Sequence, residues 1–147
     1  MEENIPLDEK SVVVQTHIGI LQNVIQRMSA NSASCKAYAI TIVSAILVIV
    51  ADKNKPEYSL ISILPTILFL ALDAYYLALE KGFRKAYEDF VKKVHLGSVS
   101  INDVYELKIS GKMLSHQINA IKSFSVWGFY SILIMLIFMT NEIIKGV

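Results

Sequence analysis

The chain has 147 residues, 54% of them hydrophobic, with a mean hydropathy of +0.47 and a formal net charge of +1. A soluble domain of this length can bury a core with far less apolar content, so the composition favours a membrane protein. The near-neutral charge gives no basic field for nucleic acid, and we expect no direct nucleic-acid binding. The single cysteine, Cys35, excludes an intrachain disulfide and a CxxC metal site.

The first predicted element is an amphipathic cytoplasmic helix over residues 11–31. Its apolar residues recur at spacings of three and four and therefore share one face, which consists of Val14, Ile18, Leu21, Ile25 and Met28. No proline interrupts the chain from Ser11 to Ala51. We therefore expect one long helix that continues into the membrane, with a bend near residues 31–34.

Three segments are long and apolar enough to cross a bilayer, namely residues 32–51, 58–79 and 123–140. A span needs roughly 20 predominantly apolar residues, and the segments meet that need although they include Lys36, Pro65 and Asp73. The first two spans are joined only by residues 52–57, which forces an antiparallel hairpin. We predict an all-α membrane protein with three transmembrane helices in a single membrane domain over residues 1–147. The alternative is a buried helical bundle in a soluble protein.

The distribution of basic residues predicts the orientation. Eleven lysines and arginines fall in the chain up to Lys36 and in the loop over residues 80–122, against three beyond the other ends of the spans. Basic residues accumulate on the cytoplasmic side of membrane proteins. We therefore expect the N-terminus in the cytoplasm and the C-terminus outside.

The cytoplasmic loop over residues 80–122 is predicted to be helical. The helix of the second span continues with apolar residues at spacings of three and four, and Ser100 and Asp103 then form a capping pair for a further helix, INDVYELKI. From Met113 a helix runs into the last span. The amphipathic faces of these helices pack on neighbouring helices, within or between subunits, or else lie on the lipid surface with the help of the basic residues.

Asp73 poses the main chemical question, because an aspartate at the centre of a membrane helix costs about 2.5–3.5 kcal/mol. Its helix face also carries Glu80 and Arg84, which can pair with each other at a spacing of four residues. Asp73 therefore needs a partner from another helix, and Lys36 or Arg27 on the first helix is the best candidate.

Two interpretations of Asp73 remain open from the residues alone. In the first, Asp73 and a basic residue form a structural pair inside the membrane that fixes the register of the helices. In the second, Asp73 lines a water-filled vestibule or pore and attracts cations. The other polar residues of the spans are small hydroxyls that can bond to their own helix, so they give little support for a wide pore.

Catalytic and metal-binding patterns are missing from the sequence. His17, His95 and His116 stand in no ligand spacing, and each is predicted to be a surface or interface residue on a cytoplasmic helix. The sequence has no GxSxG motif, no glycine-rich phosphate loop and no Cys/His pair. We expect no enzyme, no cofactor and no metal. We expect Cys35 to be a free buried thiol, with palmitoylation as the alternative.

Two stretches resemble a bacterial family. QNVIQRMSANSASCKAYAITIVSAI, residues 22–46, carries the pattern RMxxNSxxCK, and LPTILFLALDAYYLALEKGFRKAYEDF, residues 64–90, carries PxxxFxxLDxYYLxxExxFR. Together they resemble small bacterial membrane proteins and, more distantly, the SLATT group of two-span membrane modules followed by a cytoplasmic helix. The third span and the lack of an attached sensor domain depart from that group.

The SLATT resemblance implies an effector of anti-phage defence in the bacterial inner membrane that perforates the lipid bilayer when a soluble partner, encoded nearby, signals. Because three helices cannot enclose an aqueous path, a pore requires a homo-oligomer. The resemblance also favours a polar cluster at the cytoplasmic membrane surface, formed by Arg27, Asn31, Lys36, Asp73, Tyr76, Glu80 and Arg84. The alternatives are a non-catalytic membrane anchor or regulatory subunit that binds a soluble partner, and an autonomous ion channel or transporter.

Overall fold

The computed structural model describes residues 9–146, and every regular element in that part of the chain is a helix. In chain order the elements are α1 (Val12–Lys53), the 3₁₀ helix η1 (Pro56–Ser62), α2 (Ile63–His95), α3 (Ile101–Tyr105), α4 (Met113–Ile121) and α5 (Phe124–Lys145). The structure confirms the prediction of an all-helical chain with three helices long and apolar enough to cross a membrane. Residues 1–8 and 147 lie outside the described part.

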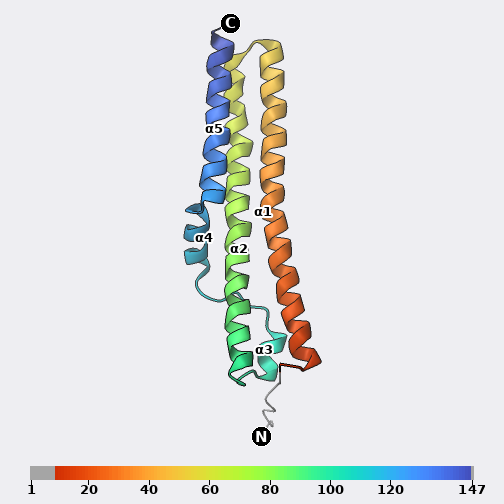
Figure 1. Ribbon diagram of the computed structural model, residues 1–147. Coiled ribbons are helices and arrows are strands. Elements are labelled where there is room, and N and C mark those ends of the chain that lie inside the picture. The colour runs from red at the N-terminus through yellow and green to blue at the C-terminus, as the bar shows by residue number, and fades with distance from the viewer. Residues whose placement is uncertain (1–8, 147) are drawn as a thin grey trace.

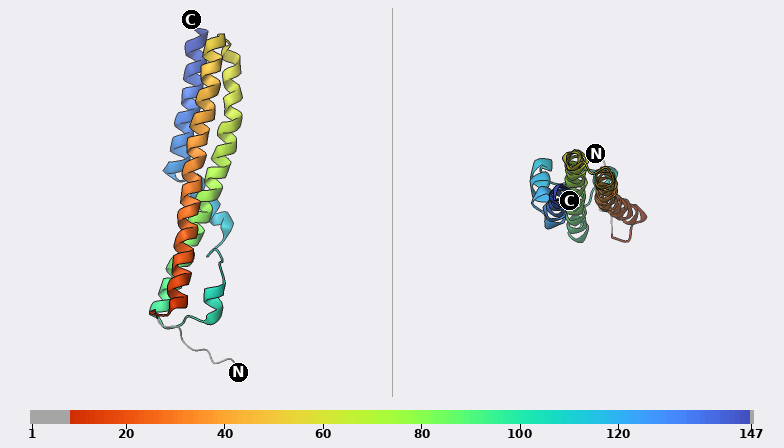
Figure 2. Two further views of the ribbon diagram at one scale, coloured as in Figure 1. Left: turned by 90° about the vertical axis from the view of Figure 1, so that its right-hand side faces the viewer. Right: turned by 90° about the horizontal axis from the view of Figure 1, so that it is seen from above.

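The molecule is an elongated hairpin of α1 and α2, and α5 lies beside only its upper part (Figure 1). At 1.5 Å per residue, α1 is about 63 Å long and α5 about 33 Å. The chain therefore has two halves. The three-helix half comprises residues 32–53, 56–79 and 124–145, and the stalk comprises residues 12–31 and 80–121. The described N-terminal and C-terminal ends lie at opposite ends of the molecule (Figures 1 and 2).

Each half has its own apolar core. The core of the three-helix half is formed by Ala39, Val43, Ala74, Val126, Tyr130, Leu133 and Ile137. The core of the stalk is formed by Val14, Leu21, Phe90, Val99 and Val104. Because α1 and α2 contribute to both cores, the two long helices connect the stalk rigidly to the three-helix half.

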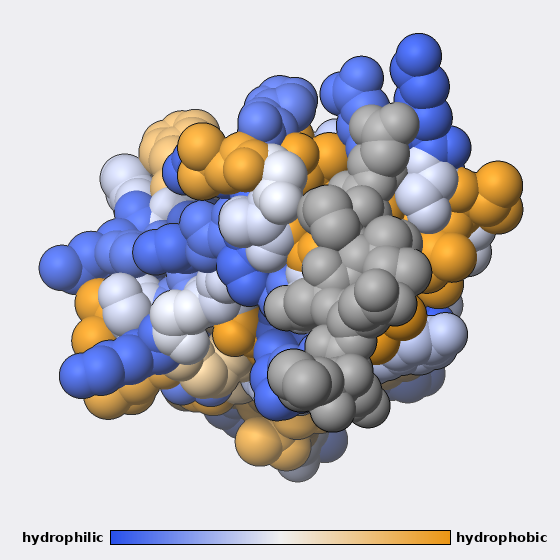
Figure 3. Space-filling view, turned by 90° about the horizontal axis from the view of Figure 1, so that it is seen from below, coloured by the Kyte–Doolittle hydropathy of each residue, from blue (hydrophilic) through white to orange (hydrophobic). Residues whose placement is uncertain are grey.

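The outer faces of the three-helix half are apolar. In the most apolar windows of the three long helical segments only 22%, 22% and 33% of the residues are buried inside the chain. Val48, Leu64 and Ile132, for example, are 68%, 75% and 57% exposed. The lower end of the molecule instead mixes hydrophilic and hydrophobic side chains (Figure 3). A helix that is apolar on every side suits burial in protein or in lipid.

The long first helix is confirmed, since α1 is unbroken from Val12 to Lys53, including residues 31–34. It ends at Asn54, which adopts the left-handed conformation with φ of 49° and donates its backbone N–H to the carbonyl of Ala51. Asparagine tolerates this conformation better than most residues. The helix thus stops at the start of the short turn that the sequence predicts.

The second span differs from the prediction at its beginning, because residues 56–62 form the 3₁₀ helix η1 rather than α-helix. Pro56 at the first position supplies no backbone N–H to the helix. The hydroxyl of Ser62 bonds to the carbonyl of Ser59, and that of Thr66 to the carbonyl of Ser62 at 2.8 Å. The first bond lies within η1, spans three residues and competes there with regular α-helix bonding, whereas the second is the i−4 bond of a threonine inside α2.

The capping pair is confirmed in the stalk, but the helix that it opens is shorter than predicted. Ser100 and Asp103 form a capping box at the start of α3. The helix ends at Tyr105, and Glu106 is extended with φ of −104° and ψ of 122°. The following strand-like segment crosses α2 where Gly82 leaves room for the side chain of Ile109. This crossing requires an extended chain and explains why the helix stops early.

The predicted continuous helix from Met113 into the last span is wrong, because α4 and α5 are separate helices (Figure 1). The break lies at Ser123, whose ψ of 132° is extended and whose carbonyl accepts the N–H groups of Val126 and Trp127. Lys81 on α2 donates to the carbonyl of Asn119 at 2.9 Å and holds α4 against α2. The break allows α5 to turn away and follow the hairpin.

Candidate functional site

A buried ion pair joins α1 to α2 in the three-helix half. Asp73 is fully buried, and its Oδ2 lies 2.6 Å from Nζ of Lys36. Its Oδ1 accepts a hydrogen bond from Oγ of Ser32 at 2.5 Å. Of the two candidate partners that the sequence offers, the structure selects Lys36, because the side chain of Arg27 is exposed.

The local sequence explains why these groups meet. Ser32 and Lys36 are four residues apart and therefore share one face of α1, and Lys36 also approaches Oγ of Ser32 at 3.4 Å. The small residues Ala39 on α1 and Ala74 on α2 are buried beside the pair. Small residues let two helices approach closely, so a short serine and a lysine suffice to reach the carboxylate.

The ion pair lies near the lower end of the three-helix half. Lys36 is about 26 Å along α1 from the helix end at Lys53, at 1.5 Å per residue. A hydrocarbon layer is about 30 Å thick. A bilayer whose far surface coincides with the hairpin tip would therefore have the pair just inside its near edge, where the stalk begins.

The third helix brings Tyr130 to the same place. Its side chain, including the hydroxyl, is fully buried, and it packs in one core with Ala39 and Ala74 beside the ion pair. Within the described residues this hydroxyl has no hydrogen-bond partner of standard geometry. The sequence reasoning missed Tyr130, which lies about two turns into the last span and meets the pair only through the packing of the third helix.

The predicted cluster of seven residues divides into two pairs and three separate residues. Besides the Lys36–Asp73 pair, Arg84 binds Glu80 at 2.8 Å, as the spacing predicts. Glu80 lies about 10 Å, or two helical turns, further along α2 than Asp73. No side-chain hydrogen bond within residues 9–146 connects the remaining three members to either pair, and these members are Arg27, Asn31 and Tyr76.

A second polar group lies inside the upper end of the three-helix half. Ser59, Ser62 and Thr66 are fully buried against α5, which contributes the buried Asn141. Oγ of Ser59 and Oδ1 of Asn141 have no hydrogen-bond partner within the described residues. Between this group and the ion pair the interior is apolar.

The apolar interval consists of Ala39, Val43, Leu133 and Ile137, all buried. In residues 9–146 the polar side chains therefore form no continuous path through the three-helix half of one chain. Sequence reasoning treated the serines only as residues bonded to their own helix, and it missed Asn141. The buried side of the 3₁₀ helix is what brings these side chains together.

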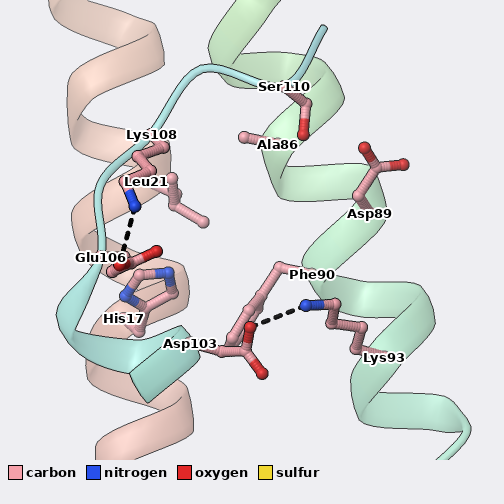
Figure 4. A pocket seen from close by; sticks show the side chains of 10 residues that line it. All are labelled: His17, Leu21, Ala86, Asp89, Phe90, Lys93, Asp103, Glu106, Lys108 and Ser110. Carbon is pink, nitrogen blue, oxygen red and sulfur yellow. Dashed lines mark hydrogen bonds and ion pairs between the residues drawn. The ribbon is translucent and has the colours of Figure 1, made fainter. Parts of the chain in front are cut away.

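The stalk contains a cavity of about 380 Å³ between α1, α2 and the segment after α3 (Figure 4). His17 is buried here: its ring packs against Phe90 at a centroid distance of 4.5 Å, and Nδ1 lies 2.9 Å from the carbonyl of Val104. His17 is thus an interface residue, as the sequence predicts.

Four of the five Asp, Glu and Lys side chains around this cavity form two ion pairs. Lys93 lies 2.7 Å from Asp103, and Lys108 lies 2.7 Å from Glu106 (Figure 4). The hydrogen bond from Lys93, with that from the backbone N–H of Ser100, holds the pKa of the Asp103 carboxyl below its usual 3.8. The first pair fastens α3 to α2, whereas the second lies within the segment after α3. Among the residues that the structure describes, no group of three or more His, Cys, Asp or Glu is arranged to hold a metal ion.

Comparisons with known proteins identify no relative of this chain. No protein-family model, no curated protein and no solved structure matches the chain significantly. The class that the structure defines is therefore a helical protein with three candidate membrane-spanning helices. The resemblance to the SLATT group stays a prediction that depends on the residues quoted for it.

Proposed function

We propose that this chain is a multi-pass protein of the bacterial inner membrane and an effector of anti-phage defence. When a soluble partner signals, it oligomerises and disrupts membrane integrity or ion gradients. The observation that carries the proposal is the Lys36–Asp73 pair, buried at the junction between an apolar three-helix half and a polar stalk. The stalk is the part available to a soluble partner, and the pair is the charged group nearest to it inside the bundle.

The energetics of the pair suit a bundle with two states, one in which the pair is buried and one in which Asp73 reaches water. Removing one partner of a buried ion pair leaves an uncompensated charge and costs about 3–5 kcal/mol. A rearrangement of the bundle that gives Asp73 access to water would remove much of that penalty. Such a rearrangement needs other chains, because the interior of one chain is closed by apolar residues above the pair. Several copies, each contributing Asp73, would surround an acidic, cation-attracting opening.

The test of this function uses cells that carry the gene in its native neighbourhood. After phage challenge, a potential-sensitive dye should report depolarisation of the inner membrane, and deletion of the gene should abolish it. The extracted chain should be larger than a monomer in mild detergent after challenge. An unchanged membrane potential in challenged cells that contain the chain would contradict the proposal.

The second candidate is a non-catalytic membrane anchor or regulatory subunit that holds a soluble partner on the stalk. It is favoured by the apolar interior above the ion pair and by the paired charges around the stalk cavity, which describe a closed scaffold. The same experiment separates the two. An anchor would retain its partner in the membrane fraction while the membrane potential stays unchanged. An autonomous channel or transporter, the third candidate, would instead change the potential without phage or partner.

A further inference from the structure

A groove runs along the outside of the hairpin tip, between the end of α1 and η1. Its volume is about 460 Å³, within the range of roughly 300–1,000 Å³ that is typical of small-molecule sites. The turn after Lys53 sets α1 and η1 apart, and the connection arches between them at the top of the molecule (Figure 1). The groove is therefore a product of the 3₁₀ start of the second span.

The walls of the groove are apolar. Ile46, Ile49 and Val50 of α1 line it together with Tyr58 and Ile61 of η1. Ile49 and Ile61 are 62% and 56% exposed, so this surface is covered by no other part of the described chain. In a bilayer such a groove accepts hydrocarbon, because its apolar walls need no polar partner and an acyl chain lying in the groove gains close van der Waals contacts with them.

Two lysines stand at the end of the groove that lies at the hairpin turn. Lys53 and Lys55 both line it, and Nζ of Lys55 lies 5.5 Å from the centroid of the Tyr58 ring. Lys53 approaches Asp52 at 3.3 Å, but both side chains are about 70% exposed, and such surface pairs are weak. Within residues 9–146 Lys55 has no ion pair. Lysine and tyrosine at the end of a membrane helix are typical of the headgroup level.

We propose that this groove binds one anionic phospholipid of the leaflet at the hairpin tip. An acyl chain lies between α1 and η1, and the phosphate contacts the ammonium groups of Lys53 and Lys55. The proposal rests on the membrane placement of the chain but not on its role in defence. A zwitterionic phospholipid has the same acyl chains but less net negative charge. The preference for the anionic lipid over the zwitterionic one is therefore expected to come from the headgroup.

The test measures lipid retention by native mass spectrometry of the full chain, extracted from vesicles that contain equal phosphatidylglycerol and phosphatidylcholine. The wild-type chain should retain phosphatidylglycerol in preference. Because each lysine near a membrane surface contributes an attraction equivalent to about five-fold in binding, retention should fall about five-fold for Lys53→Gln or Lys55→Gln and more for both. Ile49→Trp, which fills the groove and keeps the charges, should reduce retention of both lipids.

The matched control is Lys145→Gln, which removes one positive charge at the same end of the molecule but outside the groove. It should leave retention unchanged. Equal losses in Lys145→Gln and Lys55→Gln would overturn the proposal in favour of unspecific surface charge. Equal retention of the two lipids would also overturn it, because the headgroup charge would then contribute nothing. A chain absent from the membrane fraction would overturn the membrane placement itself. Selective retention in a chain that does not depolarise cells would leave this site intact and contradict only the proposed function.

Discussion

Lys36 of α1 and Asp73 of α2 form an ion pair at 2.6 Å, with the carboxylate fully buried and the lysine side chain 19% exposed. The pair therefore lies where the stalk meets the three-helix half. The Lys36 side chain has partial access to the surroundings, whereas Asp73 has none and contacts Lys36 and Ser32. Substitution of Lys36 should accordingly lower the free energy of unfolding more than an average substitution at the surface does.

The first prediction concerns the stability of this pair. Lys36→Met leaves the buried carboxylate of Asp73 without its cation and should lower the free energy of unfolding by about 3 kcal/mol or more. Asp73→Asn leaves a lysine that can reach water and should cost less. The double change Lys36→Met with Asp73→Leu should recover most of the loss, because an apolar pair of similar volume needs no partner.

These losses would be measured as the thermal midpoint and the abundance of the chain in detergent. Arg27→Met, which removes an exposed cation elsewhere on α1, is the matched control and should have little effect. A double variant that is less stable than Lys36→Met alone would contradict the account. It would mean that the unpaired carboxylate of Asp73 is not what destabilises Lys36→Met.

The second prediction compares two glycines in the long helices. A Cβ at Gly82 would lie 2.2 Å from Cγ2 of Ile109, whereas a Cβ at Gly19 would meet nothing within 4 Å. Gly82→Ala should therefore push the segment after α3 away from α2 and destabilise the stalk. Gly19→Ala should stabilise the chain by about 0.4–1 kcal/mol, because alanine has less freedom to lose on folding.

Chemical denaturation of the two glycine variants provides the comparison, and Ile109→Ala in the Gly82→Ala background should restore part of the stability. If both alanines stabilise the chain equally, the segment around Ile109 does not cross α2 as described.

The third prediction concerns pH. The pKa of Asp103 is lowered in the folded chain, so its contribution to stability is present above the usual value of 3.8 and is lost as the pH falls through the lower folded value. Protection of the amides of α3 from hydrogen exchange should fall in that acidic window. Asp103→Asn should show low protection at every pH. Wild-type protection that does not change below pH 3.8 would show that Lys93 and the capping box contribute nothing.

The sequence predicts the long elements of the fold well, because their signals are local. The period of three to four residues, the short turn and the capping box of Ser100 and Asp103 each depend on neighbours in the chain. The 3₁₀ start of the second span, the early end of α3 and the break at Ser123 depend on contacts between distant elements. The close crossing of Ile109 over Gly82 is one example, because no pattern of neighbouring residues predicts it.

The part of the candidate site that could be predicted is the ion pair, because a buried charged side chain needs a partner of opposite charge. A carboxylate in an apolar span and a lysine near the start of the first span lead to Lys36–Asp73. Tyr130 and Asn141 were not predictable, because both look like ordinary residues of an apolar helix until the rotation of α5 about its axis is known. That rotation is set by packing against Ala39 and Ala74, far away in the sequence.

The fourth prediction concerns orientation. A reporter inserted at Gly97, in the turn after α2, should report the cytoplasm, and one inserted at Asn54 in the hairpin turn should report the outside. The physical reason is the bias of lysine and arginine toward the stalk. A third reporter, joined after the C-terminus, should agree with the one at Asn54, because α5 ends beside the hairpin tip (Figure 1). Agreement of Gly97 with Asn54 would contradict the membrane placement.

The most direct test of the central claim is the membrane potential of challenged cells that carry either the wild-type chain or the double variant Lys36→Met with Asp73→Leu. Both chains should reach the membrane in equal amounts and in complexes of equal mass. The wild-type chain should depolarise the inner membrane, and the double variant should not, because it lacks the buried carboxylate of Asp73 that would be presented to water. Equal depolarisation by both chains would show that the buried pair only holds the helices in register, and a maintained potential in wild-type cells would contradict the effector function altogether.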